Sequence, residues 1–126
     1  MTLILDAGAF IAVERNDRDV IGLIKGERNA GRSPVTHGGV IAQIWRGGTG
    51  RQVQLARLLE GTDIRPLDGV LGRKAGILIG RSGASDCIDA ALVCLAADDD
   101  YLVTCDVEDL THLADTADLH VEILQV

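Results

Sequence analysis

Aromatic residues are scarce in this sequence, which has one Trp, one Tyr and one Phe among 126 residues. The apolar share is nevertheless 47%, so a hydrophobic core has to be built mainly from Leu, Ile, Val and Ala. Such a composition is typical of α/β proteins, whose central strands are short branched aliphatic runs. A chain of this length can bury one sizeable core but not two. We therefore expect a single domain, residues 1–126.

Long apolar runs are also missing. The longest uninterrupted one, residues 90–97, is far shorter than the roughly 20 residues that a membrane-spanning helix needs. The N-terminal stretch "MTLILDAGAF" has no basic leader, and Asp6 stands where a signal peptide would need its apolar middle. The sequence therefore predicts a soluble cytoplasmic protein without a membrane partner.

Cysteine pairs that could bind zinc or form a disulfide framework are absent. The three cysteines, Cys87, Cys94 and Cys105, form no CxxC motif and are odd in number, which argues against both kinds of site. We expect them to be buried and to act as small apolar residues.

Several catalytic motifs are missing as well. The sequence has no GxSxG elbow, and its glycine-rich "GGTGRQV" lacks the lysine of a phosphate-binding loop. A haloacid-dehalogenase-like phosphatase would need an acid at position 8, which is Gly8. The three histidines are far apart in the sequence, and we expect each to be a surface or helix-cap residue: His37, His112 and His120.

Positive charge is in short supply, because 12 Lys and Arg face 19 Asp and Glu and give a net charge of −7. This is the wrong sign for a protein that holds nucleic acid by phosphate contacts alone. A polyanionic substrate would need a bound metal, a local arginine patch or a partner. Arg46 and Arg51 flank the loop "RGGTGR", where they either lie in a solvated turn or contact a substrate phosphate.

What the sequence does contain is a regular alternation of short apolar runs with amphipathic stretches. The runs predict strands at 3–6, 33–39, 62–67, 101–106 and 120–126. The stretches predict helices at 7–16, 19–29, 40–46, 51–61, 68–80, 85–98 and 107–115. Strands that alternate with helices form a mainly parallel sheet with helices on both faces.

Acidic residues stand at the ends of two predicted strands. Asp6 and Asp106 each follow an apolar strand, and ligands of parallel sheets bind outside the carboxyl ends of the strands. Asp89 lies one turn into a nearly all-apolar helix, where an unpaired carboxylate is unfavourable. Acids that meet without a lysine repel one another unless a cation joins them. Hard divalent cations with oxygen ligands, Mg²⁺ or Mn²⁺, would satisfy such a group.

Helix capping is an equally plain interpretation of the same acids. Asp86 and Asp89 have the spacing of a capping box at the start of a helix, and Asp106 and Asp109 repeat it. Both pairs also place negative charge at a helix N-terminus, where the helix dipole favours it. Residue spacing alone leaves the choice between cap and ligand open.

Four segments, taken together and in order, resemble a known family. They are "ILDAGAF", "VIAQIWRGG", "SDCIDAALVCLAA" and "LVTCDVEDLTHLA", and they are similar to the PIN-domain nucleases, specifically to the VapC-type toxins of bacterial toxin–antitoxin pairs. The resemblance runs from residue 2 to about residue 124. It implies a PIN-like three-layer α/β/α sandwich and a Mg²⁺- or Mn²⁺-dependent endoribonuclease. It also implies a homodimer whose cognate antitoxin inserts a segment into the active-site groove.

The resemblance assigns roles to individual residues. Asp6, Asp89 and Asp106 match the family's metal-binding acids, and Thr104 matches the threonine of its "TxD" strand end. Asp86 and Asp109 correspond to accessory acids. Arg46 and Arg51 are not assigned by the resemblance and remain candidates for contact with substrate because they flank the glycine-rich loop.

One position departs from the family pattern, because Gln43 stands where a glutamate is usual. A glutamine amide can accept a hydrogen bond from metal-bound water but contributes no charge, which predicts weaker metal binding and a slow nuclease. Glu14 in the first helix could substitute, although it is more simply a solvated acid. Two alternatives remain: a binding module for RNA or antitoxin with weakened catalysis, and a Mg²⁺-dependent phosphatase of another α/β family.

Overall fold

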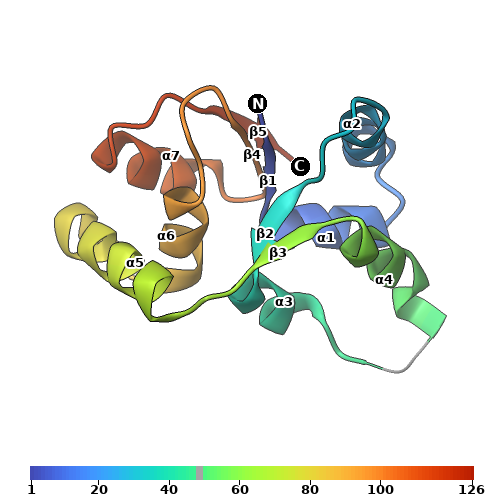
Figure 1. Ribbon diagram of the computed structural model, residues 1–126, viewed down its shortest axis with the longest axis horizontal. Helices are drawn as coiled ribbons and strands as arrows, with labels where there is room; N and C mark the ends of the chain where they lie inside the picture. Colours follow the sequence, from blue (N-terminus) through green and yellow to red (C-terminus); the bar gives the residue numbers. More distant parts are fainter. Residues whose placement is uncertain (48–49) are drawn as a thin grey trace.

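The sheet is central to the fold and all of its strands are parallel. The computed structural model describes residues 1–47 and 50–126, apart from the side chain of Arg51. Within this part of the chain the strand order is β3-β2-β1-β4-β5 (Figure 1). The strands are β1 Leu3–Leu5, β2 Val35–His37, β3 Asp63–Arg65, β4 Tyr101–Thr104 and β5 Glu122–Gln125.

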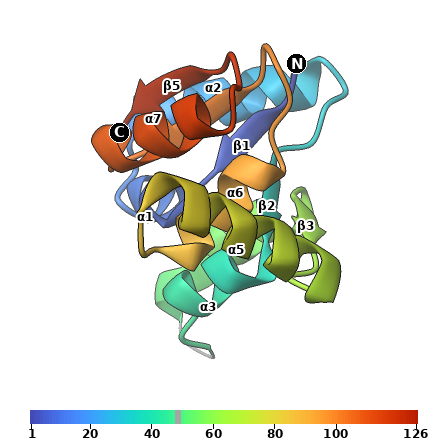
Figure 2. The same cartoon turned by 90° about the vertical axis from the view of Figure 1, so that its left-hand side faces the viewer.

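Helices cover both faces of this sheet. They are α1 Ala7–Glu14, α2 Arg18–Asn29, α3 Gly38–Ile44, α4 Val53–Glu60, α5 Gly69–Ser82, α6 Cys87–Cys94 and α7 Val107–Thr116. Helices α5, α6 and α7 lie on one side, and α1, α2 and α4 lie on the other (Figures 1 and 2). A short 3₁₀ turn, Gly50–Gln52, precedes α4. The predicted α/β class and three-layer α/β/α arrangement are confirmed, and each predicted element is present.

Aspartates begin most of these helices. Asp6, Asp17, Asp68, Asp86 and Asp106 are N-caps whose side chains accept hydrogen bonds from backbone amides of the first turn. Such caps satisfy amides that have no partner within the helix. Their frequency explains why the helix starts could be predicted from the sequence.

The core consists of aliphatic residues, as the composition predicts. Strand β1 is buried along its whole length, and the single phenylalanine, Phe10, is 0% exposed. Helix α6 buries four consecutive residues, from Ala90 to Val93, which agrees with its nearly all-apolar sequence. None of the helices in the described residues is long and apolar enough to cross a membrane.

The expectation that the cysteines are buried is wrong. Cys87 and Cys105 are exposed, and Cys94 is half-buried. Cys87 is the first residue of α6, and Cys105 directly follows β4, so both lie where an element begins or ends at the sheet edge. We predicted burial because these cysteines stand next to apolar runs in the sequence, but Cys87 and Cys105 lie just where those runs begin or end.

Candidate metal site

Two acids leave neighbouring strands at the same edge of the sheet. Strands β1 and β4 pair in parallel with Leu5 opposite Val103, and the Asp6 amide donates a hydrogen bond to the Val103 carbonyl over 3.2 Å. Asp6 and Asp106 therefore begin α1 and α7 beside each other at the carboxyl ends of their strands. This is the convergence that the sequence pattern predicts.

Thr104 connects these two acids. It is the last residue of β4 and is 0% exposed. Its side-chain oxygen accepts a hydrogen bond from the Asp106 amide over 2.8 Å, and its hydroxyl group is hydrogen-bonded to the Asp6 side chain, which lowers the Asp6 pKa. A hydroxyl can donate once and accept at the same time. Thr104 thus orients both acids without itself being exposed.

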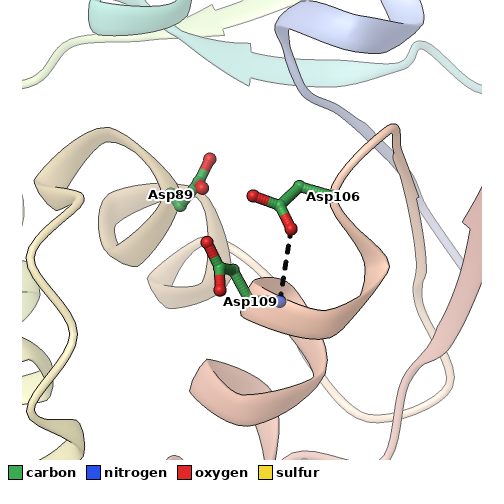
Figure 3. Close-up of side chains that lie close together, drawn as sticks. All are labelled: Asp89, Asp106 and Asp109. Carbon is green, nitrogen blue, oxygen red and sulfur yellow. Dashed lines mark hydrogen bonds between the residues drawn. The ribbon is translucent and has the colours of Figure 1, made fainter.

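Three carboxyl groups converge at this edge: those of Asp89, Asp106 and Asp109. One oxygen from each lies within 4.8 Å of the other two, and Figure 3 shows the side chains pointing toward one another from α6 and from the start of α7. We call these residues the acidic cluster. Asp109, expected only as an accessory acid, is a full member, whereas Asp6 lies beside the cluster and outside this closest group.

The electrostatics of the cluster are unfavourable without a cation. Burial and, to a smaller extent, the charges of Asp86, Asp6, Asp106 and Asp109 together raise the pKa of Asp89 to about 7. A hydrogen bond to the Asp106 carboxylate is the main cause that raises the pKa of Asp109. The ion pairs found in the described residues are Arg32–Glu27 and Arg65–Asp63, so no basic side chain in that part of the chain pairs with the cluster.

Asp6 also has an unusual environment, because it is only 6% exposed. Burial raises its pKa, while the Thr104 hydroxyl and the amides of Ala9, Gly8 and Cys105 oppose that rise. One oxygen of its carboxylate accepts the Ala9 amide hydrogen over 2.9 Å. The acid is therefore held rigidly at the base of the site.

Capping and metal binding do not exclude each other in this arrangement. Asp86 accepts hydrogen bonds from the amides of Ile88 and Asp89 over 2.9 and 3.1 Å, which confirms its predicted role as a cap. Asp106 caps α7 by a longer bond of 3.4 Å from the Asp109 amide. A carboxylate has two oxygens and about four acceptor positions, so the second oxygen of Asp106 can bind a ligand while the first caps the helix.

Gln43 lies exposed in the last turn of α3. One turn earlier on the same helix face, Gly39 is so close to α6 that an added Cβ would lie 2.6 Å from the Ile88 side chain. Residues four apart share a helix face, so Gln43 lies on the same face of α3 as Gly39. That face contacts α6 at Ile88, the residue before Asp89.

Glu14 does not reach the site as a substitute ligand. It ends α1 and lies eight residues, or about 12 Å along the helix axis, from Asp6.

Arg46 has a structural role that sequence spacing did not reveal. Its guanidinium donates hydrogen bonds of 2.9 to 3.2 Å to the carbonyls of Ala42, Gln43 and Trp45, which have no other helical partners at the end of α3. These bonds occupy two of its nitrogens. The side chain of Arg51, the other arginine expected to contact substrate, lies outside the described part of the chain.

Gln52 has a structural role that sequence reasoning missed. It is 8% exposed, and its side chain donates to the Ile44 carbonyl and accepts from the amides of Arg46 and Gly47 over 2.9 to 3.2 Å. It therefore fixes the turn after α3. No sequence pattern distinguishes such a buried amide from a surface glutamine.

His37 is a cap, as expected, but not a surface residue. It is 0% exposed; its Nδ1 accepts the Gly39 amide hydrogen over 3.0 Å, and its Nε2 lies 2.9 Å from the Ile88 carbonyl. Because Nδ1 accepts, Nε2 carries the hydrogen and donates it to Ile88. Burial lowers the pKa of this histidine. The neutral ring joins α3 to the first turn of α6, where Asp89 lies.

The donor set of the acidic cluster fits a hard divalent cation. Magnesium keeps oxygen ligands at about 2.1 Å, so two oxygens on opposite sides of the ion are about 4.2 Å apart. The carboxylate oxygens already lie within 4.8 Å of one another, and small side-chain rotations would close the difference. A cation would also relieve the repulsion that raises the Asp89 pKa.

The sequence matches no protein-family model and no curated protein. A function for the acidic cluster therefore has to be inferred from its own geometry and chemistry.

Proposed function

We propose that this protein is a Mg²⁺- or Mn²⁺-dependent endoribonuclease. The observation that carries this proposal is the convergence of Asp89, Asp106 and Asp109 within 4.8 Å at the carboxyl edge of a parallel sheet. No basic side chain among the described residues forms an ion pair with them. Carboxylates arranged in this way are ligands for hard divalent cations. Such ions are the usual means by which proteins cleave phosphodiesters.

The residues of the site would have different roles. The acidic cluster would hold the ion, Asp6 would complete the negative charge at its base, and Thr104 keeps Asp6 and Asp106 in position. When bound, the ion supplies a water of lowered pKa and stabilises negative charge on the phosphate. Ligation also requires that Asp89 give up its proton, and its pKa of about 7 means that this proton leaves near neutral pH.

RNA as the substrate requires that the negative charge of the chain be neutralised at the site. A protein with a net charge of −7 repels polyanions unless its site is locally neutralised, and a divalent ion supplies that neutralisation where the phosphate must approach. The resemblance to the VapC-type toxins extends the proposal: a cytoplasmic, homodimeric toxin of a type II toxin–antitoxin pair, inhibited by a cognate antitoxin.

A second function is favoured by one specific position. Gln43 is neutral, and it lies on the face of α3 that contacts α6. If this position belongs to the site, the missing charge weakens ion binding, and the protein would act mainly by binding RNA or the antitoxin.

The test is cleavage of a structured RNA in Mg²⁺ or Mn²⁺. We expect cleavage by the wild-type protein that EDTA abolishes and that Asp106→Asn reduces by about 100-fold or more, because one ligand charge is lost. Asp68→Asn is the matched control, since it makes the same change at the N-cap of α5, and asparagine caps as well as aspartate. Equal cleavage by all three proteins would identify a contaminating nuclease and overturn the proposal.

A further inference from the structure

A groove lies along α1, beside the candidate site. It has a volume of about 420 Å³ and is lined by Gly8, Ile11, Ala12, Arg15, Asp17, Cys105 and Val126. Four of these residues, at positions 8, 11, 12 and 15, have the spacing of one helix face. The volume lies within the range of small-molecule sites and is sufficient for a nucleoside unit.

The groove lies next to the candidate metal site. Cys105, which lines it, stands between Thr104 and Asp106 in the chain. At the other wall, Gly8 follows Asp6 by two residues, and an added Cβ there would lie 2.7 Å from the Cys105 sulfur. Two lining residues, Gly8 and Cys105, are therefore close in the chain to Asp6 and Asp106, which do not themselves line the groove.

Its chemistry changes from apolar to basic with distance from the acids. Gly8, Ile11 and Ala12 give an apolar wall, and Ile11 is 39% exposed. Arg15 stands at the far end and forms no ion pair within the part of the chain that the structure describes. Asp17 also lines the groove, and one oxygen of its carboxylate accepts the amides of Asp19 and Val20 over 3.0 and 3.3 Å, so the start of α2 offsets part of its negative charge.

We propose that this groove binds the strand of RNA next to the scissile phosphate, with Arg15 pairing with a neighbouring phosphate and the apolar wall contacting the sugar and base. The inference rests on the proposed function and names its substrate as a single-stranded segment. Gly8 and Arg15 are seven residues, or about 10 Å, apart along α1. At about 3.4 Å per stacked nucleotide, Arg15 contacts a phosphate within three nucleotides of the bond that is cut.

Arg15 thus takes the role that sequence spacing gave to Arg46. The guanidinium of Arg46 is already bonded to the last carbonyls of α3. Arginine is suited to bind phosphate through paired N–H groups, and such contacts position a strand without selecting its sequence.

The test is the salt dependence of RNA binding. A fluorescent single-stranded RNA of twelve nucleotides is titrated by anisotropy at several salt concentrations, with Ca²⁺ in place of Mg²⁺ and with the probe checked for integrity on a gel. We expect Arg15→Gln to weaken binding several-fold and to reduce the slope of log K against log salt by roughly 0.7, the value for one phosphate contact on a single strand. Arg73→Gln, an exposed arginine on α5, is the control and should leave the slope unchanged.

A second pair of variants tests the apolar wall. Ile11→Glu and Leu23→Glu change helical residues of equal exposure, 39% and 40%, but only Ile11 lies in this groove. We expect Ile11→Glu alone to weaken RNA binding strongly, because its carboxylate would repel the strand.

The outcomes separate this inference from the proposed function. If Arg15→Gln and Arg73→Gln show equal slopes of log K against log salt while metal-dependent cleavage is intact, RNA binding in the groove is contradicted and the proposed nuclease activity is not. Loss of slope in Arg15→Gln, with cleavage that Asp106→Asn does not change, would support the groove and overturn the nuclease. A wild-type protein that does not bind the RNA would overturn the groove outright.

Discussion

The Thr104 side-chain oxygen accepts a hydrogen bond from the Asp106 amide over 2.8 Å, and its hydroxyl is hydrogen-bonded to the Asp6 carboxylate. One buried threonine therefore fixes two of the acids at the candidate site. Thr104→Val keeps the shape of the side chain and removes both bonds. We expect a loss of stability of about 1–3 kcal/mol, a further rise of the Asp6 pKa, and a divalent-ion affinity lower by about 10-fold or more.

Thr36→Val is the matched control for this change. Thr36 is also 0% exposed, and its hydroxyl donates to the Leu5 carbonyl over 2.9 Å and not to a carboxylate. Thermal unfolding should show a similar loss of stability in both variants, while calorimetric Mn²⁺ titration should show weaker binding only in Thr104→Val. An ion affinity that falls equally in both would mean that Thr104 has no special role.

Asp89 makes the stability of the ion-free protein depend on pH. Its pKa is about 7 in the folded protein against 3.8 as a model value for an aspartate. Between these values the folded state binds more protons than the unfolded state, so stability falls as the pH rises from about 4 to 7 and is level above that. Asp89→Asn should therefore stabilise the protein at pH 8 but not at pH 4, by about 1–2 kcal/mol once solvent screening of the half-exposed group is included.

Thermal unfolding in EDTA across this pH range measures the effect, with a shift in Tm of about 4–8 °C expected at pH 8. Asp19→Asn changes an exposed acid in the first turn of α2 and serves as the control. If the Tm of Asp89→Asn differs from that of the wild type by the same amount at pH 4 and pH 8, as we expect for Asp19→Asn, the raised pKa of Asp89 is contradicted.

Gln43→Glu adds a carboxylate to the face of α3 that contacts α6. If this position belongs to the site, Mn²⁺ affinity should rise several-fold, because ligand charge increases the affinity of such sites, and RNA cleavage should accelerate. Gln125→Glu makes the same change at the exposed end of β5 and should alter neither quantity. Equal Mn²⁺ affinities for the two variants and the wild type would place Gln43 outside the site.

Gly8 allows α1 to approach the turn after β4. An added Cβ would lie 2.7 Å from the Cys105 sulfur and 3.0 Å from its backbone nitrogen, and a backbone atom cannot move aside easily. Gly8→Ala should therefore lower the free energy of unfolding by about 1–3 kcal/mol. Gly22→Ala, in α2, meets no atom within 4 Å and should raise it by about 0.5–1 kcal/mol. Chemical denaturation distinguishes the two, and a stabilised Gly8→Ala would contradict the close packing.

The fold was largely predictable because the residues that begin and end its helices are recognisable from the local sequence. Aspartate caps such as Asp68 and Asp86 sit at helix starts, and Gly83 ends α5 with a φ of 73°, a conformation that glycine adopts without strain. Strands as short as β1 were predictable because their residues are uniformly branched or long aliphatic and are followed by an acid.

The residues that form the candidate site were less predictable than the fold. The convergence of Asp6 and Asp106 follows from strand order, but the closest group contains Asp109 in place of Asp6. That choice depends on how α6 lies against α7 and on side-chain rotamers, neither of which residue spacing encodes. The role of Arg46 at the end of α3, and the exposure of Cys105, likewise depend on the local path of the chain.

Direct titration of Mn²⁺ into the protein at pH 7.5 tests the central claim, that the acidic cluster is a divalent-cation site. We expect saturable binding to the wild type and to Asp68→Asn, and an affinity lower by about 10-fold or more in Asp106→Asn. We also expect proton release on binding, because Asp89 must ionise. Absence of saturable binding to the wild-type protein, or equal affinity in Asp106→Asn, would contradict it.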